Sequence, residues 1–312
     1  MTGGSFVKLT RPVCYTRAMD LVALIAERPL LLDGGLGLAL MSRGFAAGEC
    51  PEEWNVTHPA DVADIHRAFY VAGSDIVNTN SFGGTGLRLE AHGMAARAVE
   101  LNEAAARLAV AVRDREFPGR FVAGDIGPCG KMVRPMGDAD PEALRAAFVE
   151  QAEALVRGGV DLLNIETMFD LTEARIAVEA VVSAAAGRPV LASMAFKPAA
   201  RGFRTMMGVD PASAVAALKD AGAAMVGCNC EITAESMAEL VPILAELNGG
   251  VTCAQPNAGQ PRLEDGQTVY DETPEHFAAV VGGYPALGAR IVGGCCGTPP
   301  ESIAALAAAL GR

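Results

Sequence analysis

Two adjacent cysteines, Cys295 and Cys296, lie between glycines in the segment IVGGCCGTPP near the end of the chain. Neighbouring residues of an extended strand point to opposite faces, so both sulfurs can reach one target only where the strand gives way to an irregular turn. The flanking Gly293, Gly294 and Gly297 supply the backbone freedom that such a turn needs. The two thiols are therefore expected to act together.

A third cysteine, Cys230, follows another apolar segment earlier in the chain. If both segments are nearby strands of one sheet, three thiols meet at its edge. Three thiolates and one vacant position describe a catalytic zinc site, because structural zinc normally takes all four ligands from the protein. Soft thiolates also favour zinc over magnesium or calcium. The sequence therefore predicts one zinc ion held by Cys230, Cys295 and Cys296.

An open zinc position can bind a substrate thiol, lower its pKa and hold it as a nucleophilic thiolate. The natural reaction of such a site is alkyl transfer to sulfur. Water activation is an alternative, but hydrolytic zinc more often has His and carboxylate ligands, and none of the four histidines follows a zinc-ligand spacing. A redox-active cysteine pair is another alternative, and so is a non-enzymatic zinc- or thiol-sensing protein whose fourth metal position is filled.

The remaining cysteines suggest no second site. Eight cysteines in 312 residues indicate free thiols or metal ligands in a reducing compartment, and not a disulfide framework. Cys228 and Cys253 lie on apolar segments and are expected to be small core residues. No role is predicted for Cys14, Cys50 or Cys129.

Charge and hydropathy narrow the class of protein. A net charge of −12 argues against nucleic acid or an anionic membrane as the main partner, because both select for clustered Lys and Arg. No apolar stretch reaches the roughly 18 residues of a membrane-spanning helix, and the first twenty residues lack a signal-peptide core. We expect a cytoplasmic enzyme that acts on small molecules.

Short apolar runs alternate with alanine-rich stretches of helical spacing, a pattern that indicates a parallel sheet with crossover helices. Eight such runs predict a single-domain α/β fold, the (β/α)₈ TIM barrel. An open doubly wound sheet is the alternative, but no GxGxxG turn follows an early strand. The predicted strands span 30–33, 75–80, 121–126, 161–166, 189–195, 224–229, 251–256 and 290–294.

The helices and the amino terminus complete the prediction. Helices are expected at 60–72, 142–157 and 211–221, each followed by glycine as a cap. Residues 1–20 are predicted to be an N-terminal extension and residues 21–312 to form the barrel, with a helix over 21–27 on the barrel floor.

Catalytic groups in such barrels collect at the carboxyl ends of the strands. The predicted strand ends carry polar and thiol side chains that would meet on one rim: Asp33, Asn80 to Thr85, Asp125 to Pro128, Glu166 and Thr167, Asn229 and Cys230, Gln255 to Gly259, and Cys295 and Cys296.

Several motifs together resemble the homocysteine S-methyltransferase family. They occur in the family's order: LLDGGLG (31–37), NTNSFGGT (78–85), GDIGPCG (124–130), IET (165–167), GCNC (227–230) and GGCCG (293–297). The resemblance implies a zinc-dependent barrel over 21–312 that binds homocysteine and methylates its sulfur to form methionine. It also implies that Cys230, Cys295 and Cys296 are the zinc ligands and the catalytic centre.

The resemblance further implies the substrate-binding residues. Asp33 and Glu166 would hold the ammonium group of homocysteine, although a solvated or helix-capping carboxylate is the simpler alternative for each. Asn229, beside a zinc ligand, would join them. The glycine-rich turn is suited to take the substrate carboxylate on backbone N–H groups, unless it is only a tight turn. It consists of Ser81, Phe82, Gly83, Gly84 and Thr85.

The methyl donor is the least determined element. PEEWN (51–55), PNAGQP (256–261) and TVYDETPEHFA (268–278) resemble the cobalamin-dependent type, which predicts a stand-alone barrel that takes its methyl group from a separate methyl-corrinoid (methylcobalamin) protein. Betaine or another small onium donor, such as S-methylmethionine, is the alternative, since DGGLGLALMSRGF (33–45) resembles the betaine type.

A betaine pocket should offer aromatic faces to the quaternary ammonium. Phe82 and Trp54 are the candidates, but the SFGGT turn lacks the tyrosine that vertebrate-like betaine enzymes carry there. The sequence leaves open the oligomeric state, a selenium analogue as acceptor, and the role of the 198–207 loop.

Overall fold

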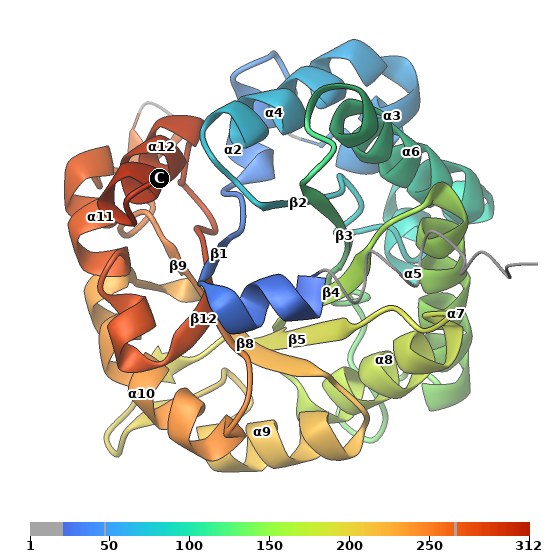
Figure 1. The fold of residues 1–312 in the computed structure, drawn as a ribbon. Coiled ribbons are helices and arrows are strands. Elements are labelled where there is room, and N and C mark those ends of the chain that lie inside the picture. Colours follow the sequence, from blue (N-terminus) through green and yellow to red (C-terminus); the bar gives the residue numbers. More distant parts are fainter. Residues whose placement is uncertain (1–20, 47, 265–266) are drawn as a thin grey trace, which may run out of the picture.

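The computed structural model describes residues 21–46, 48–264 and 267–312. Its main sheet has eight parallel strands, and each one overlaps a segment predicted from the sequence. They follow one another around a ring (Figure 1). In chain order they are β1 (Leu30–Leu31), β2 (Ile76–Asn78), β3 (Phe121–Ile126), β4 (Leu162–Met168), β5 (Val190–Met194), β8 (Met225–Thr233), β9 (Thr252–Asn257) and β12 (Ala289–Val292).

The ring closes between β1 and β2. The Asp75 N–H donates to the Leu31 carbonyl at 2.7 Å. In the opposite direction, the Leu31 N–H donates to the Asp75 carboxylate at 2.9 Å. The sheet is therefore a nearly closed barrel, which confirms the (β/α)₈ prediction and excludes the open doubly wound sheet.

Helices surround the barrel on its outside. The predicted helices at 60–72, 142–157 and 211–221 correspond to α4, α7 and α9. Aspartates cap several of them: Asp140, Asp170 and Asp210 accept hydrogen bonds from first-turn N–H groups of α7, α8 and α9. The long helices are α4 (Pro59–Val71), α6 (Ala98–Glu116), α7 (Pro141–Gly158), α8 (Leu171–Ala184), α9 (Pro211–Asp220), α10 (Ala234–Asn248), α11 (Pro274–Val281) and α12 (Pro300–Ala309).

Short helices fill the first loops and the last connection. They are α2 (Leu36–Met41), η1 (Pro51–Glu53), α3 (Trp54–Thr57), α5 (Gly86–Leu89), η2 (Glu90–His92), η3 (Ala95–Arg97) and η4 (Tyr284–Leu287). Apart from η4, they lie in the segments that follow β1 and β2. These segments therefore form part of the rim at which the strands end.

A helix over residues 21–27 crosses the barrel at its floor (Figure 1). Its Leu21 and Ile25 are buried in one cluster with Leu30, Ile76 and Phe121 from the strands. The helix therefore seals the amino-terminal end of the barrel with apolar contacts, in the position expected from the sequence. The predicted extension over residues 1–20 lies outside the described residues.

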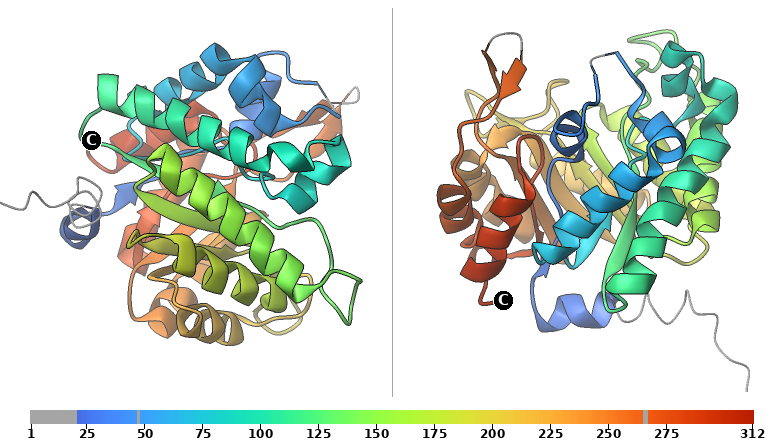
Figure 2. Two further views of the ribbon diagram at one scale, coloured as in Figure 1. Left: turned by 90° about the vertical axis from the view of Figure 1, so that its right-hand side faces the viewer. Right: turned by 90° about the horizontal axis from the view of Figure 1, so that it is seen from above.

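Two hairpins extend the rim and were not predicted. One pairs β6 (Lys197–Pro198) with β7 (Phe203–Arg204) in the loop after β5, and the other pairs β10 (Arg262–Glu264) with β11 (Gln267–Val269) after β9. Figure 2 shows the second hairpin standing at the end of the barrel opposite the 21–27 helix. Such short antiparallel pairs carry too little periodicity to be identified from sequence.

Among the described helices, none has the length and apolar character needed to cross a membrane.

Candidate active site at the carboxyl ends of the strands

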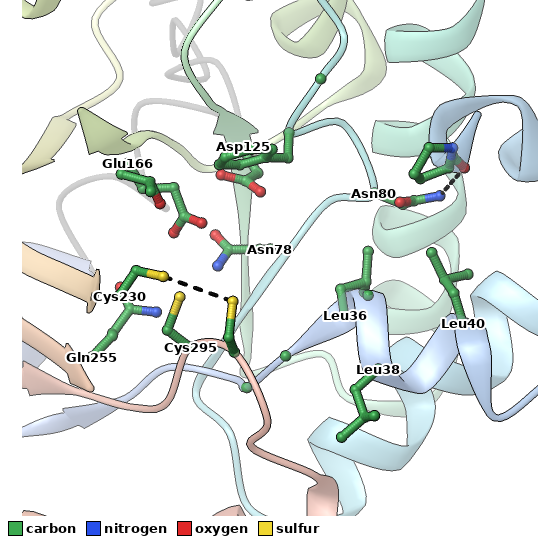
Figure 3. A pocket seen from close by; sticks show the side chains of 18 of the residues that line it. Leu36, Leu38, Leu40, Asn78, Asn80, Asp125, Glu166, Cys230, Gln255 and Cys295 are labelled. Carbon is green, nitrogen blue, oxygen red and sulfur yellow. Dashed lines mark hydrogen bonds between the residues drawn. The ribbon is translucent and has the colours of Figure 1, made fainter. Parts of the chain in front are cut away.

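A cavity of about 350 Å³ opens at the rim of the barrel. Figure 3 shows its cysteines and carboxylates at one end and the leucines of α2 at the other. Residues from the ends of β2, β3, β4, β8, β9 and β12 line it together with the segments that follow β1 and β2. Its side chains include Leu36, Leu38, Leu40, Glu52, Asn78, Asn80, Phe82, Arg88, Asp125, Glu166, Cys230, Gln255, Cys295 and Cys296.

The structure brings the three predicted cysteines together in this cavity. Cys295 and Cys296 lie in the turn after β12, and Cys230 lies in the last part of β8. Their sulfurs all lie within 4.8 Å of one another, and the sulfurs of Cys230 and Cys296 are 3.7 Å apart. Two sulfurs bound to one tetrahedral zinc ion at about 2.3 Å are expected to lie about 3.8 Å apart. The donor set and its spacing therefore fit a single metal ion.

Residues around the three cysteines have unusual backbone conformations, which set the directions of the side chains in the cavity. Cys230 has a φ of 60° and Thr167, which follows Glu166, also has a φ of 60°. Left-handed backbone is costly for residues with a side chain and tends to occur at functional sites. Gly297 has a φ of 80°, and a Cβ there would lie 2.3 Å from the Tyr270 ring, so no other residue fits. The sequence indicated the glycine but not the strained Thr167 and Cys230.

Hydrogen bonds make Cys230 the most acidic thiol of the group. Those from Cys295 and Cys296, with a further one from Asn257, lower the pKa of Cys230 to about 4. Donating to Cys230 raises the pKa of the Cys295 thiol. Asn229 supports the group from behind, because its amide nitrogen lies 3.6 Å from the Cys295 sulfur. The site thus favours negative charge on sulfur, which a metal cation would compensate.

Asn229 also fixes the end of β4. Its side-chain oxygen accepts from the Thr167 N–H at 2.7 Å, and its amide donates to the Thr167 hydroxyl at 2.7 Å. Asn229 is fully buried and does not line the cavity. It therefore positions Thr167 and Cys295, and its predicted place in the substrate site stays a prediction.

Asp33 and Glu166 lie at two ends of a buried amide chain. The Asp33 carboxylate accepts from the Asn78 backbone N–H at 2.8 Å and from its side-chain amide at 3.2 Å. Asn164 then donates to the Asn78 side-chain oxygen and to the Glu166 carboxylate, each at 3.1 Å. Glu166 lines the cavity, whereas Asp33 is fully buried beneath it. Burial and the charge of Cys230 raise the pKa of Glu166 to about 7.

Asp125, at the end of β3, is a second carboxylate in the cavity wall. It is 6% exposed, and its Oδ1 has no hydrogen-bond partner among the described residues. Burial and the charges of Glu166, Asp33 and Glu52 raise the pKa of Asp125 well above its ordinary value. The sequence placed Asp125 at a strand end but gave no reason to prefer it over Asp33. Two carboxyl groups that resist ionisation therefore lie beside the cysteines, and a cationic group bound there would stabilise their charged forms.

The Ser81–Thr85 turn reaches the cavity only in part. Phe82 and Gly83 line it, whereas Ser81, Gly84 and Thr85 lie behind it. The Ser81 hydroxyl donates to the Asp125 carbonyl at 2.7 Å, and Thr85 caps α5. The side chain of Asn102 occupies the space where Gly84 would carry a Cβ.

One N–H of this turn is already occupied. The Gly83 N–H donates to the Glu52 carboxylate at 2.6 Å, and the Cys50 thiol also donates to Glu52, at 3.3 Å. Glu52 belongs to PEEWN, a motif that the sequence connected with the donor type and not with the turn.

The two candidate aromatic side chains already pack against other groups. Trp54 is 5% exposed, stacks on His58 with ring centroids 4.1 Å apart, and does not line the cavity. The Phe82 ring carries the Arg88 guanidinium at 5.3 Å from its centroid and packs against the backbone of Gly127.

The other cysteines and histidines lie mostly away from the metal-ligand group. Cys228 and Cys253 are buried in the core, as expected from the sequence. Cys50 and Cys129 are buried too, and Cys14 lies outside the described residues. His66 is fully buried, whereas His276 lies beside Glu235 and Glu272 at the surface. Only His92 among the histidines lines the cavity, so the described part of the chain offers no histidine-based zinc site there.

Comparisons with known proteins agree with this geometry. The chain is 30% identical over 307 residues to the methionine synthase of Mycobacterium leprae and 30% identical over 305 residues to that of Mycobacterium tuberculosis. These matches cover 94% and 93% of this chain but only 25% of each relative, so the chain spans about a quarter of their length.

A solved structure matches over nearly its whole length. The metallated form of the homocysteine methyltransferase MmuM from Escherichia coli is 27% identical, with a TM-score of 0.76, and the match covers 92% of this chain and 99% of that one. The sequence profile described as Homocysteine S-methyltransferase matches residues 30–310. That range includes every strand and the whole cavity. The chain therefore belongs to the homocysteine S-methyltransferase family.

Proposed function

We propose that this protein is a zinc-dependent methyltransferase that moves a methyl group to the sulfur of homocysteine and so forms methionine. One observation carries the proposal: three convergent thiols lie beside buried carboxylates in one cavity. A substrate with a thiol and an ammonium group a few ångströms apart fits this arrangement. Homocysteine is such a molecule.

Cys230, Cys295 and Cys296 would hold the zinc ion, because their spacing matches one tetrahedral centre. Zinc with thiolate ligands supplies one kind of chemistry here: it lowers the pKa of a thiol in its open position and keeps that thiol deprotonated near pH 7. Asn229 orients the group through its contact with Cys295.

The carboxylates would bind the substrate ammonium. Asp125 offers an oxygen without a partner, and Glu166 offers a carboxylate held by Asn164. Asp33 acts on the same group indirectly, since it fixes Asn78, which in turn bonds Asn164. A bound cation would relieve the repulsion among the buried carboxylates, so its attraction is stronger than it would be in water.

For the methyl donor we propose a separate methyl-corrinoid protein that docks on the rim. Four exposed apolar side chains support this: Met41 (53% exposed), Met136 (70%), Met206 (66%) and Leu263 (76%) lie in the segments after β1, β3, β5 and β9. All four segments follow barrel strands and so lie at the rim end, where exposed apolar side chains suit contact with a partner protein. The methionine synthase relatives carry three quarters of their length outside the matched region, where a donor module could lie.

A small onium donor is the second candidate, because the barrel matches 99% of the single-barrel MmuM chain. Betaine fits poorly, since Trp54 is outside the cavity and the Phe82 ring carries Arg88 on one side and Gly127 against it. A sulfonium such as S-methylmethionine makes less use of an aromatic cage and remains the stronger small donor.

The test is methionine formation by zinc-loaded protein with homocysteine, under anaerobic conditions, with methylcobalamin, glycine betaine or S-methylmethionine as donor. We expect turnover with methylcobalamin. Turnover with S-methylmethionine or betaine alone would replace the corrinoid proposal with the onium one. Absence of homocysteine binding by calorimetry would contradict the acceptor itself.

A further inference from the structure

The segment that follows β9 packs against the turn that carries Cys295 and Cys296. The Cys295 N–H donates to the Pro256 carbonyl at 2.8 Å, and the Ala258 N–H donates to the Cys296 carbonyl at 3.0 Å. These two hydrogen bonds fix the main chain of the turn. They leave the direction of the Cys296 side chain open, because a side chain can still rotate about its own bonds.

Tyr270 covers the same turn from the base of the second hairpin. It directly follows β11, whose last residue, Val269, pairs with Arg262 of β10. The Tyr270 ring lies close to the backbone of Gly297, since a Cβ on Gly297 would be only 2.3 Å from two ring carbons. Tyr270 does not line the cavity. It therefore contacts the cysteine turn from behind and leaves the space for a substrate free.

The Tyr270 hydroxyl is hydrogen-bonded to the Cys296 sulfur. Burial raises the pKa of the Tyr270 phenol, and the neighbouring Cys296 raises it further. A phenol keeps its proton at neutral pH, whereas a thiolate that binds a metal has none, so the hydroxyl has to be the donor. Asn229 makes a contact of the same kind, with its amide nitrogen 3.6 Å from the Cys295 sulfur.

We propose that Tyr270 is a positioning residue for the metal site: its ring holds the Cys296 turn, and its hydroxyl donates a hydrogen bond to the zinc-bound Cys296 thiolate. This rests on the proposed function, because it takes zinc as the metal. Cys296 is the most exposed of the three thiols, so water competes most readily for its sulfur. A donor held beside a thiolate ligand keeps that ligand oriented and stabilises its negative charge.

The experiment compares wild-type protein with Tyr270→Phe, which keeps the ring and loses the hydroxyl. Each protein is loaded anaerobically with Co²⁺ in place of zinc, and the charge-transfer absorption from thiolate to cobalt is recorded. A hydrogen bond lowers the energy of the sulfur electrons, so its loss should move this band to longer wavelength. Zinc affinity, measured by competition with a chromophoric chelator, should fall about tenfold, as is usual when a partner of a metal ligand is removed.

Two further variants complete the design. Tyr270→Leu also loses the ring and should bind zinc more weakly still. Tyr70→Phe is the matched control, because the Tyr70 hydroxyl donates to the Phe121 carbonyl at 2.8 Å at the floor of the barrel. It should leave the cobalt band and the zinc affinity unchanged.

The outcomes separate the parts of the proposal. An unshifted band in Tyr270→Phe, or an equal shift in Tyr70→Phe, would overturn the hydrogen bond to Cys296. Equal zinc affinity of Tyr270→Leu and Tyr270→Phe would overturn the role of the ring. Failure of the wild-type protein to bind either metal ion would instead contradict the proposed zinc site.

Discussion

A buried aspartate lies at each end of the barrel, and the two differ in their hydrogen-bond partners and in the charges around them. At the floor, Asp75 pairs with Arg28 at 2.8 Å and also with Arg120 and Arg312. At the rim, Asp125 has a carboxylate oxygen with no hydrogen-bond partner in the described part of the chain, and other carboxylates surround it. Two buried side chains of one type in one fold therefore meet opposite electrostatic environments.

The difference follows from what each end has to do. Burial opposes ionisation of Asp75, but hydrogen bonds from Arg28 and from the Leu31 N–H leave its pKa below its ordinary value. The floor charge is compensated and contributes to stability. The Asp125 charge is not compensated within the chain, and its raised pKa reflects a cost that a bound cation would offset. An uncompensated buried group therefore marks the end that binds a ligand.

The largest expected effect is the loss of zinc and activity when a rim thiol is removed, compared with the removal of a core thiol. Cys296→Ala removes one of three proposed zinc ligands, so zinc content should fall and methionine formation should drop by about a thousandfold or more. Cys228→Ala alters a fully buried thiol of the core and should retain zinc and activity. Metal analysis and turnover measured on the same preparations check both. Full activity in a zinc-free Cys296→Ala preparation would disprove the metal site.

The next effect concerns stability at the floor. Asp75→Asn leaves three arginines without their shared anion and should lower the free energy of unfolding by about 2–3 kcal/mol, discounted because the arginines are partly exposed. Denaturant unfolding of metal-free protein measures it, with an unchanged m value as the sign that only stability moved. A loss below about 0.5 kcal/mol would mean that the floor cluster is no more stabilising than surface ion pairs.

The corresponding change at the rim should act on binding instead. Asp125→Asn removes a charge from the proposed ammonium site and should weaken homocysteine binding by about tenfold, while the free energy of unfolding stays equal or rises. Calorimetry with zinc-loaded protein and homocysteine provides the measurement. Asp75→Asn, studied under conditions where it is folded, serves as the control and should bind homocysteine normally. Unaltered affinity in Asp125→Asn would refute the role of Asp125.

The smallest expected effect is on the pH dependence of the free energy of unfolding, where the two aspartates should act with opposite signs. Asp75 stabilises the fold above its ordinary pKa of 3.8, and that contribution is lost as the pH falls below this value towards its lower folded pKa. Asp125 behaves oppositely: its folded pKa is raised, so its destabilising effect grows as the pH rises from 3.8 through the folded value. The stability difference between wild type and each variant should therefore change with pH in opposite directions, by at most about 1.4 kcal/mol per pH unit.

Metal-free protein should be used throughout that series. Burial lowers the pKa of His66 from 6.5 to about 4, so its protonation destabilises every one of these proteins as the pH falls across that window. The contribution is common to wild type and variants and cancels in the differences. Two difference curves of the same sign would remove the distinction between floor and rim.

The sequence by itself determined the barrel and the convergence of the three cysteines on one rim. Eight alternating apolar segments have few other ways to bury themselves, and each of them overlaps a strand. The adjacent Cys295 and Cys296 between glycines indicate an irregular turn, and the structure places that turn directly after β12. Patterns of this kind are local, so the sequence displays them completely.

The tertiary structure alone decided which carboxylates and which cation face the cavity. Asp33 and Asp125 both end a strand in the sequence, but only the packing directs Asp125 into the cavity and turns Asp33 towards Asn78. Glu52 reaches the Gly83 N–H, and Arg88 reaches Pro128, from distant parts of the chain. The direction of a side chain and the field it meets depend on contacts between remote segments, and no local pattern encodes them.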